Sequence, residues 1–224
     1  PKTLWERTFP PGSAAFEVDE DWLGVVSSDG TLYFLDVQTG QTVRQSKVTV
    51  PPGLTQIATA VTERSIFVTL SPPVTEDALI GSKPTKLKSR HFYVNGPVHA
   101  FDRQTGNYQW SQHIENRVFP IDQVRDVPLL ICADVWKGPL DPLPEVGQVF
   151  PKIEDSEQKA DDSEALRVRY WALDSRTGRV VLNTAVNKSI VQYTVERDLA
   201  KGWVELRQGG AIFRLSYQDE GKSE

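Results

Sequence analysis

A short motif occurs three times in the chain, each time directly after an apolar run: Asp, two variable residues, Thr, Gly. An Asp at the start of a turn can accept hydrogen bonds from the backbone N–H groups that follow it, and Gly readily adopts the positive φ of a tight hairpin. We therefore interpret each copy as a capped turn between two antiparallel strands, not as a metal ligand or an acid–base residue. The motif residues are Asp36, Thr39, Gly40, Asp102, Thr105, Gly106, Asp174, Thr177 and Gly178.

Short apolar or alternating stretches bounded by Gly, Pro and Asp surround each motif and predict strands. They fall into units at about residues 13–50, 55–115, 118–187 and 189–217. The fourth unit is degenerate, because Ser216 stands where the others have Asp and no fourth strand is evident. The repeat therefore predicts four consecutive antiparallel sheets, with four strands in each complete unit.

The expected fold class is all-β: a β-propeller of four-stranded antiparallel blades spanning residues 1–224, with about four blades visible. A β-sandwich would explain the short strands but not the recurring turn. Residues 3–9 alternate like a lone outer strand, of a neighbouring blade or of the fourth unit if the ring closes on itself. Trp5 would then take the position that Trp110 holds in the second unit. The sequence leaves open a larger ring of seven or eight blades.

The repeat resembles that of the PQQ-like, or quinoprotein-dehydrogenase-like, β-propeller family. The second unit matches best, with Ala-Phe-Asp at residues 100–102, Thr-Gly at 105–106 and Trp110. The resemblance implies that this Trp packs between blades. It departs at Arg44 and Leu182, which stand at the corresponding positions of the first and third units. It also suggests an extracytoplasmic location, periplasmic or at the cell surface.

Enzymes of that family hold pyrroloquinoline quinone with a disulfide between adjacent cysteines and a Ca²⁺ ion. This chain has a single cysteine, Cys132, so it cannot form that disulfide. We therefore expect no catalytic, cofactor-binding or metal-binding residues, and no cofactor. Cys132 lies in an apolar run and is expected to be buried in a strand, and His99 is expected to pack between blades.

Composition excludes two classes of partner. The formal net charge of −5 argues against general nucleic-acid binding, which favours a basic surface. No apolar run is long enough to span a bilayer, so we expect no direct membrane insertion.

Two insertions, at residues 71–95 and 134–165, interrupt the second and third units at the same joint, between their second and third strands. Long loops on a rigid scaffold often carry binding residues. The sequence therefore favours a non-catalytic scaffold that binds a protein partner, or the remaining blades of a larger propeller, on the face with the insertions. The alternative is a diverged quinoprotein-like enzyme, or a small-ligand or carbohydrate-binding module, that uses the central funnel. The candidate partner-binding residues are Lys86, Lys88, Arg90, His91, Trp136, Leu140 and Leu143.

Overall fold

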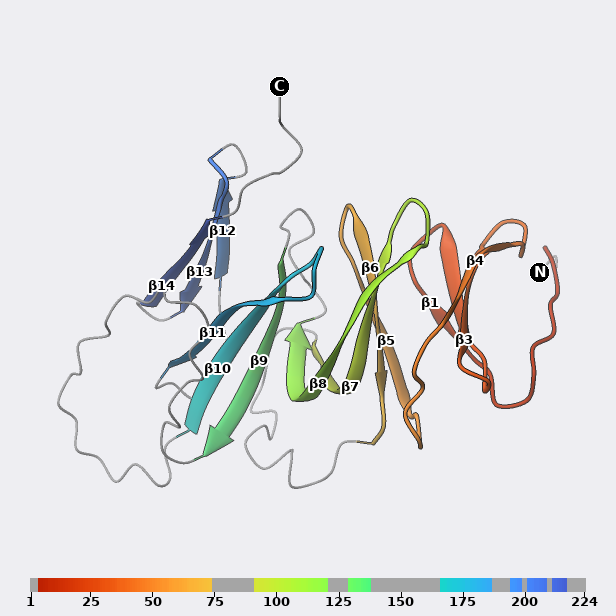
Figure 1. The fold of residues 1–224 in the computed structure, drawn as a ribbon, viewed down its shortest axis with the longest axis horizontal. Coiled ribbons are helices and arrows are strands. Elements are labelled where there is room, and N and C mark those ends of the chain that lie inside the picture. Colours follow the sequence, from red (N-terminus) through yellow and green to blue (C-terminus); the bar gives the residue numbers. More distant parts are fainter. Residues whose placement is uncertain are drawn as a thin grey trace.

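The computed structural model describes residues 4–73, 91–120, 129–137, 166–186, 194–198, 201–208 and 211–216, and every regular element in these ranges is a β-strand (Figure 1). The strands form successive antiparallel sheets that stand side by side along the molecule. The all-β propeller architecture predicted from the repeat is therefore confirmed.

The first sheet is a complete four-stranded unit with strands in sequence order. Each strand pairs with the next in antiparallel register, and Trp22 lies opposite Asp36 in the central pair. The strands are β1 (Ala14–Glu17), β2 (Trp22–Val26), β3 (Thr31–Asp36) and β4 (Thr42–Lys47).

The second and third units are joined into one seven-stranded sheet, whereas the repeat predicts separate sheets. The link is a single bridge between Val118 of β8 and Ala133 of β9. The second unit's outer strand continues without a break, because residues 114–119 contain no Gly or Pro to end it. The strands are β5 (Gln56–Val61), β6 (Ser65–Ser71), β7 (His91–Asp102), β8 (Tyr108–Pro120), β9 (Leu129–Lys137), β10 (Leu166–Asp174) and β11 (Val180–Val186).

Several predicted boundaries differ from the observed ones. β7 begins at His91, inside the expected first insertion, because its first residues pair with the end of β8. β9 continues to Lys137, inside the expected second insertion, because its end pairs with the start of β10. The third unit's first strand, expected at residues 119–124, is seen only as the end of β8, since residues 121–128 lie outside the described residues.

The fourth unit is a sheet of three described strands, β12 (Thr194–Asp198), β13 (Trp203–Gln208) and β14 (Ala211–Ser216). Its first strand was expected at residues 190–195, but pairing with β13 extends it to Asp198. Trp203 lies opposite Ser216, as Trp22 lies opposite Asp36 in the first sheet. This shared register identifies β13 and β14 as the counterparts of β2 and β3.

The three Asp-x-x-Thr-Gly motifs form the turns between β3 and β4, β7 and β8, and β10 and β11. In the second, Asp102 Oδ1 accepts hydrogen bonds from the backbone N–H and the hydroxyl of Thr105, both at 2.8 Å. These bonds favour the charged carboxylate and hold the pKa of Asp102 below its ordinary value. Gly106 has a φ of 66°, in the left-handed region. The turn geometry is therefore built from local contacts within the motif.

Adjacent units contact each other where an outer strand meets the next unit's turn. Trp110 of β8 donates its indole N–H to the carbonyl O of Ser175 at 3.0 Å and lies against Gly178. Arg44 of β4 takes the same position one unit earlier: its guanidinium donates to the carbonyl O of Thr105 and its stem lies against the turn glycine. An Arg can replace the repeat Trp because its stem supplies apolar contact and its head supplies the donor.

The core lies between neighbouring units rather than inside any one of them. The first and second units share a cluster that includes Leu32 and Phe34 on one side and Val68 and Phe101 on the other. The second and third units share another, in which Val98 and Trp110 meet Leu130, Cys132 and Leu173. Face-to-face stacking therefore removes most of the apolar surface from water.

Candidate functional site

The strand ends that carry the two insertions lie at one edge of the stacked sheets, and the turn motifs lie at the opposite edge. Ser65 pairs with Asp102, so the other end of β6 and the start of β7 lie away from that turn. Leu129 pairs with Asp174, and Leu166 with Lys137, so the third unit has the same arrangement. In Figure 1 the turn between β10 and β11 is at the top of its sheet and the end of β9 is at the bottom.

The predicted partner-binding residues are only partly covered by the structure. Lys86, Lys88, Arg90, Leu140 and Leu143 lie outside the described residues. The other two lie at the insertion-bearing edge. His91 is the first residue of β7, and Trp136 is the penultimate residue of β9, with its backbone paired to Arg167.

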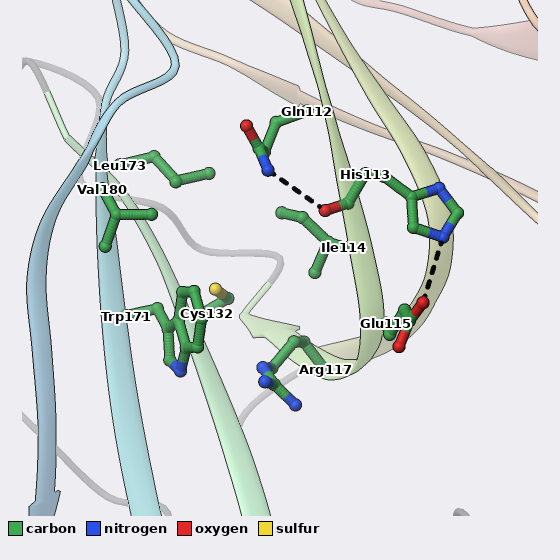
Figure 2. Close-up of a pocket in the computed structure, with 9 residues that line it drawn as sticks. All are labelled: Gln112, His113, Ile114, Glu115, Arg117, Cys132, Trp171, Leu173 and Val180. Atoms are coloured by element: carbon green, nitrogen blue, oxygen red, sulfur yellow. Dashed lines mark hydrogen bonds and ion pairs between the residues drawn. The ribbon is translucent and has the colours of Figure 1, made fainter. Parts of the chain in front are cut away.

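A cavity of about 240 Å³ opens between the second and third units (Figure 2). Its apolar lining comes from both units, with Ile114 on β8 and Trp171 on β10 among the contributors. Its charged lining residues, Glu115 and Arg117, both come from β8. The residues that line it are Gln112, His113, Ile114, Glu115, Arg117, Cys132, Trp171, Leu173 and Val180.

The Trp171 ring and the Arg117 guanidinium meet in the lining of this cavity. The indole N–H of Trp171 is buried and has no hydrogen-bond partner among the described residues, and the Arg117 guanidinium lies 4.9 Å from the ring centre. Asn183, opposite Trp171 on β11, does not line the cavity; it is 1% exposed, and neither polar atom of its amide has a hydrogen-bond partner among the described residues. An apolar group matches the Trp171 ring and the aliphatic side chains that line the cavity.

The cavity does not bring a nucleophile and a base together. Cys132 is 1% exposed and lies on the floor beside Trp171, as predicted for a buried strand residue. Figure 2 shows the His113 imidazole on the other side of β8, turned toward Glu115, with 3.7 Å between Nε2 and Oε1. Among the residues that the structure describes, no group of three His, Cys, Asp or Glu side chains could hold a metal ion.

His99 is buried between the first and second units, as predicted. It is 3% exposed, its Nε2 lies 3.5 Å from the carbonyl O of Thr49, and its Nδ1 has no hydrogen-bond partner in the part of the chain that the structure describes. Burial lowers the pKa of His99 below the ordinary value of 6.5, because the charged ring loses hydration there. The imidazole is therefore a neutral packing residue at neutral pH.

This burial predicts an acid-sensitive interface. Below pH 6.5 the unfolded chain binds a proton at His99 more readily than the folded chain, so the free energy of unfolding should fall as the pH falls. The fall has an upper limit of about 1.4 kcal/mol per pH unit, and ends below the folded pKa. Urea unfolding of the wild type and His99→Gln between pH 7.5 and 5 measures it. The variant should show a flatter profile than the wild type; parallel profiles would contradict the prediction.

The stacked sheets and their turn motifs define the chain as part of the β-propeller class. Solved structures of similar fold include a europium-containing methanol dehydrogenase, with 12% identity, TM-score 0.35 and coverage of 77% of this chain and 26% of that one. BamB from Moraxella catarrhalis has 17% identity and TM-score 0.31, over 90% and 60% of the two chains. The WD40 domain of Toxoplasma gondii coronin has 8% identity and TM-score 0.35, over 92% and 42%.

These likenesses concern the fold alone. The chain spans between 26% and 60% of the length of the three proteins. No protein-family model matches it, and no curated protein does so either. No helix in the described ranges is long and apolar enough to cross a membrane.

The sequence did not predict the cavity between β8 and the third unit. Trp171 and Arg117 are far apart in the chain and meet only because β8 continues into the third unit. The one available signal was a Trp at the alternating position that Tyr33 and His99 hold in other units. That signal predicts a contact between blades, but not a space beside it.

Proposed function

We propose that the chain is a non-catalytic propeller scaffold that binds a protein partner at its insertion-bearing edge. The proposal rests on one observation: in two adjacent units the insertion leaves the sheet at the same joint and at the same edge, whereas the opposite edge carries the tight turn motifs. Two long loops from the same edge of neighbouring units can form one continuous surface.

The stacked sheets supply a rigid support for such a surface. Phe101 and Phe119, from neighbouring strands of the second unit, are 0% and 1% exposed. The candidate contact residues combine basic side chains in the first insertion with apolar ones at the start of the second. Trp and Arg, two of the residue types in this set, are enriched at protein interfaces, and the basic members favour an acidic partner surface.

We also propose that the units are PQQ-like repeats and that the protein acts outside the cytoplasm, on the basis of the sequence resemblance. The remaining alternative is a quinoprotein-like enzyme or small-ligand binder that uses the central funnel. Titration with pyrroloquinoline quinone and Ca²⁺, followed by absorbance of the bound quinone, separates the two. Stoichiometric uptake would overturn the scaffold proposal.

Replacing the insertions tests the scaffold proposal directly. In two variants, residues 74–90 or 138–165 become a short Gly-Ser linker, and Gln38→Ala at the opposite edge is the matched control. Each variant and the wild type are expressed with a proximity-labelling enzyme in the native host, and circular dichroism melting verifies folding. We expect proteins labelled by the wild type and the control to be lost from at least one insertion variant. The same labelled proteins in every variant would contradict the proposal.

A further inference from the structure

Residues 4–9 lie in no strand, yet they are held against the first sheet at its turn (Figure 1). The indole N–H of Trp5 donates to the carbonyl O of Val37 at 2.7 Å. At the other end of the segment, the ring of Phe9 packs on Tyr33 with 5.3 Å between ring centres. The segment is therefore fixed in position without a strand beside it.

The contact made by Trp5 repeats the contact made by Trp110. Trp110 donates to the carbonyl O of Ser175, and both acceptors, Val37 and Ser175, directly follow the Asp of a turn motif. A Cβ atom added to the motif glycine would lie 2.5 Å from Cδ2 of Trp5 in one turn and 2.7 Å from Cδ2 of Trp110 in the other. Trp5 therefore occupies the place of an outer-strand residue in a unit that precedes the first sheet.

The two segments differ in what lies beside them. Trp110 belongs to β8, which pairs with β7 and places Trp110 opposite Ala100. In the part of the chain that the structure describes, no strand pairs with residues 4–9. The segment thus makes the docking contact of an outer strand but lacks the inner strands of a blade.

The described strands of the fourth sheet do not include the complementary element. Its last described strand is β14, the counterpart of β3. In the first sheet β4 pairs with one edge of β3, but no described strand pairs with the corresponding edge of β14. Figure 1 places this sheet and the N-terminal segment at opposite ends of the row of sheets. Residues 4–9 and β14 of one chain therefore do not meet in this arrangement.

We propose that residues 4–9 of one copy of this chain pair antiparallel with β14 of a second copy, and that the second copy returns the contact. Each copy then completes the other's fourth sheet, and the exchange closes a two-fold ring that leaves neither strand edge open. This inference is independent of the proposed function, because it uses neither insertion.

The repeat fixes the register of this pairing. Trp110 lies opposite Ala100, two residues before the motif Asp, and the equivalent residue of β14 is Arg214. Trp5 of one copy therefore faces Arg214 of the other, and Arg7 faces Ile212. Arg214 already lies 4.8 Å from the ring centre of Trp203, so it would lie between two indoles.

Exposed apolar side chains support the same pairing. Five large apolar side chains are exposed among the described residues, and two of them lie on the two segments in question. Leu4 is 70% exposed and Ile212 of β14 is 50% exposed. Pairing between copies would cover both edges with a neighbouring strand.

The mass of the full chain in solution is the first test. Size-exclusion chromatography with light scattering should give twice the 25.1 kDa of one chain. Successive backbone N–H groups of a strand point to opposite sides, so either Glu6 or Arg7 should donate its N–H to β14 of the second copy. Proline has no N–H, so one of the variants Glu6→Pro and Arg7→Pro should lose this hydrogen bond and give the single-chain mass. Glu6→Ala keeps the N–H group and should stay dimeric. A single-chain mass for the wild type would overturn the proposal.

Disulfide trapping tests the register and identifies the occupant. In the double variant Arg7→Cys, Ile212→Cys, mild oxidation should give a covalent dimer on a non-reducing gel, whereas either single variant should remain uncrosslinked. The native Cys132 is buried and is present in every variant. A disulfide within one chain, or none at all, would overturn pairing with a second copy.

Discussion

Replacing Trp110 with alanine is expected to lower the free energy of unfolding by about 3–5 kcal/mol, the range for truncating a large buried aromatic side chain. Trp110 is 9% exposed, packs on Phe67 with 5.8 Å between ring centres, and donates to Ser175 of the next unit. The substitution removes apolar contact and leaves that carbonyl without its partner. Guanidinium unfolding at 25 °C measures the change.

Two further variants separate the causes of this effect. Trp110→Phe keeps much of the ring contact but loses the N–H donor, so it should cost less than alanine, on the order of 1–3 kcal/mol for the unpaired buried carbonyl. Val43→Ala, on the exposed side of β4, should change stability by only about 0.5 kcal/mol. If Trp110→Ala lowered the free energy of unfolding no more than Val43→Ala does, the contact of Trp110 with the next unit would not stabilise the fold.

Phe101→Ala should have a comparable effect, about 3–5 kcal/mol, at the interface between the first and second units. Phe101 is fully buried, and its ring meets Phe34 of the first sheet edge-on, with 5.0 Å between centres. Deletion of the ring leaves a cavity that the β-sheets on either side can fill only by shifting together.

A double-mutant cycle shows whether this effect crosses the interface. Phe34→Ala and Phe101→Ala should couple by about 0.5–1.5 kcal/mol, because each removes one half of the aromatic pair. Additive losses in chemical unfolding would mean that the two sheets do not share a core.

The turns could be predicted from sequence because their contacts are local. Asp102, Thr105 and Gly106 lie within five positions of one another, and their hydrogen bonds require no distant partner. The alternation of apolar residues likewise predicted the strands of the first sheet, whose order follows the chain.

The sequence predicted that neighbouring units contact each other, but not every residue that makes the contact. The resemblance predicted that Trp110 packs between blades, but nothing in the local sequence predicted that Arg44 could make the equivalent contact with Thr105. The continuity of β8 was also missed, because the expected separation between units rested on spacing and not on a turn signal. The cavity beside Trp171 depends on that continuity.

The stacking of successive sheets through an outer-strand indole is tested most directly by nuclear Overhauser contacts in solution. The Trp110 ring should show contacts with the Hα atoms of Gly178, and the Trp5 ring with those of Gly40, since each ring lies against the glycine of the next turn. Contacts from Trp110 only to residues of its own unit, β5 to β8, would contradict face-to-face stacking.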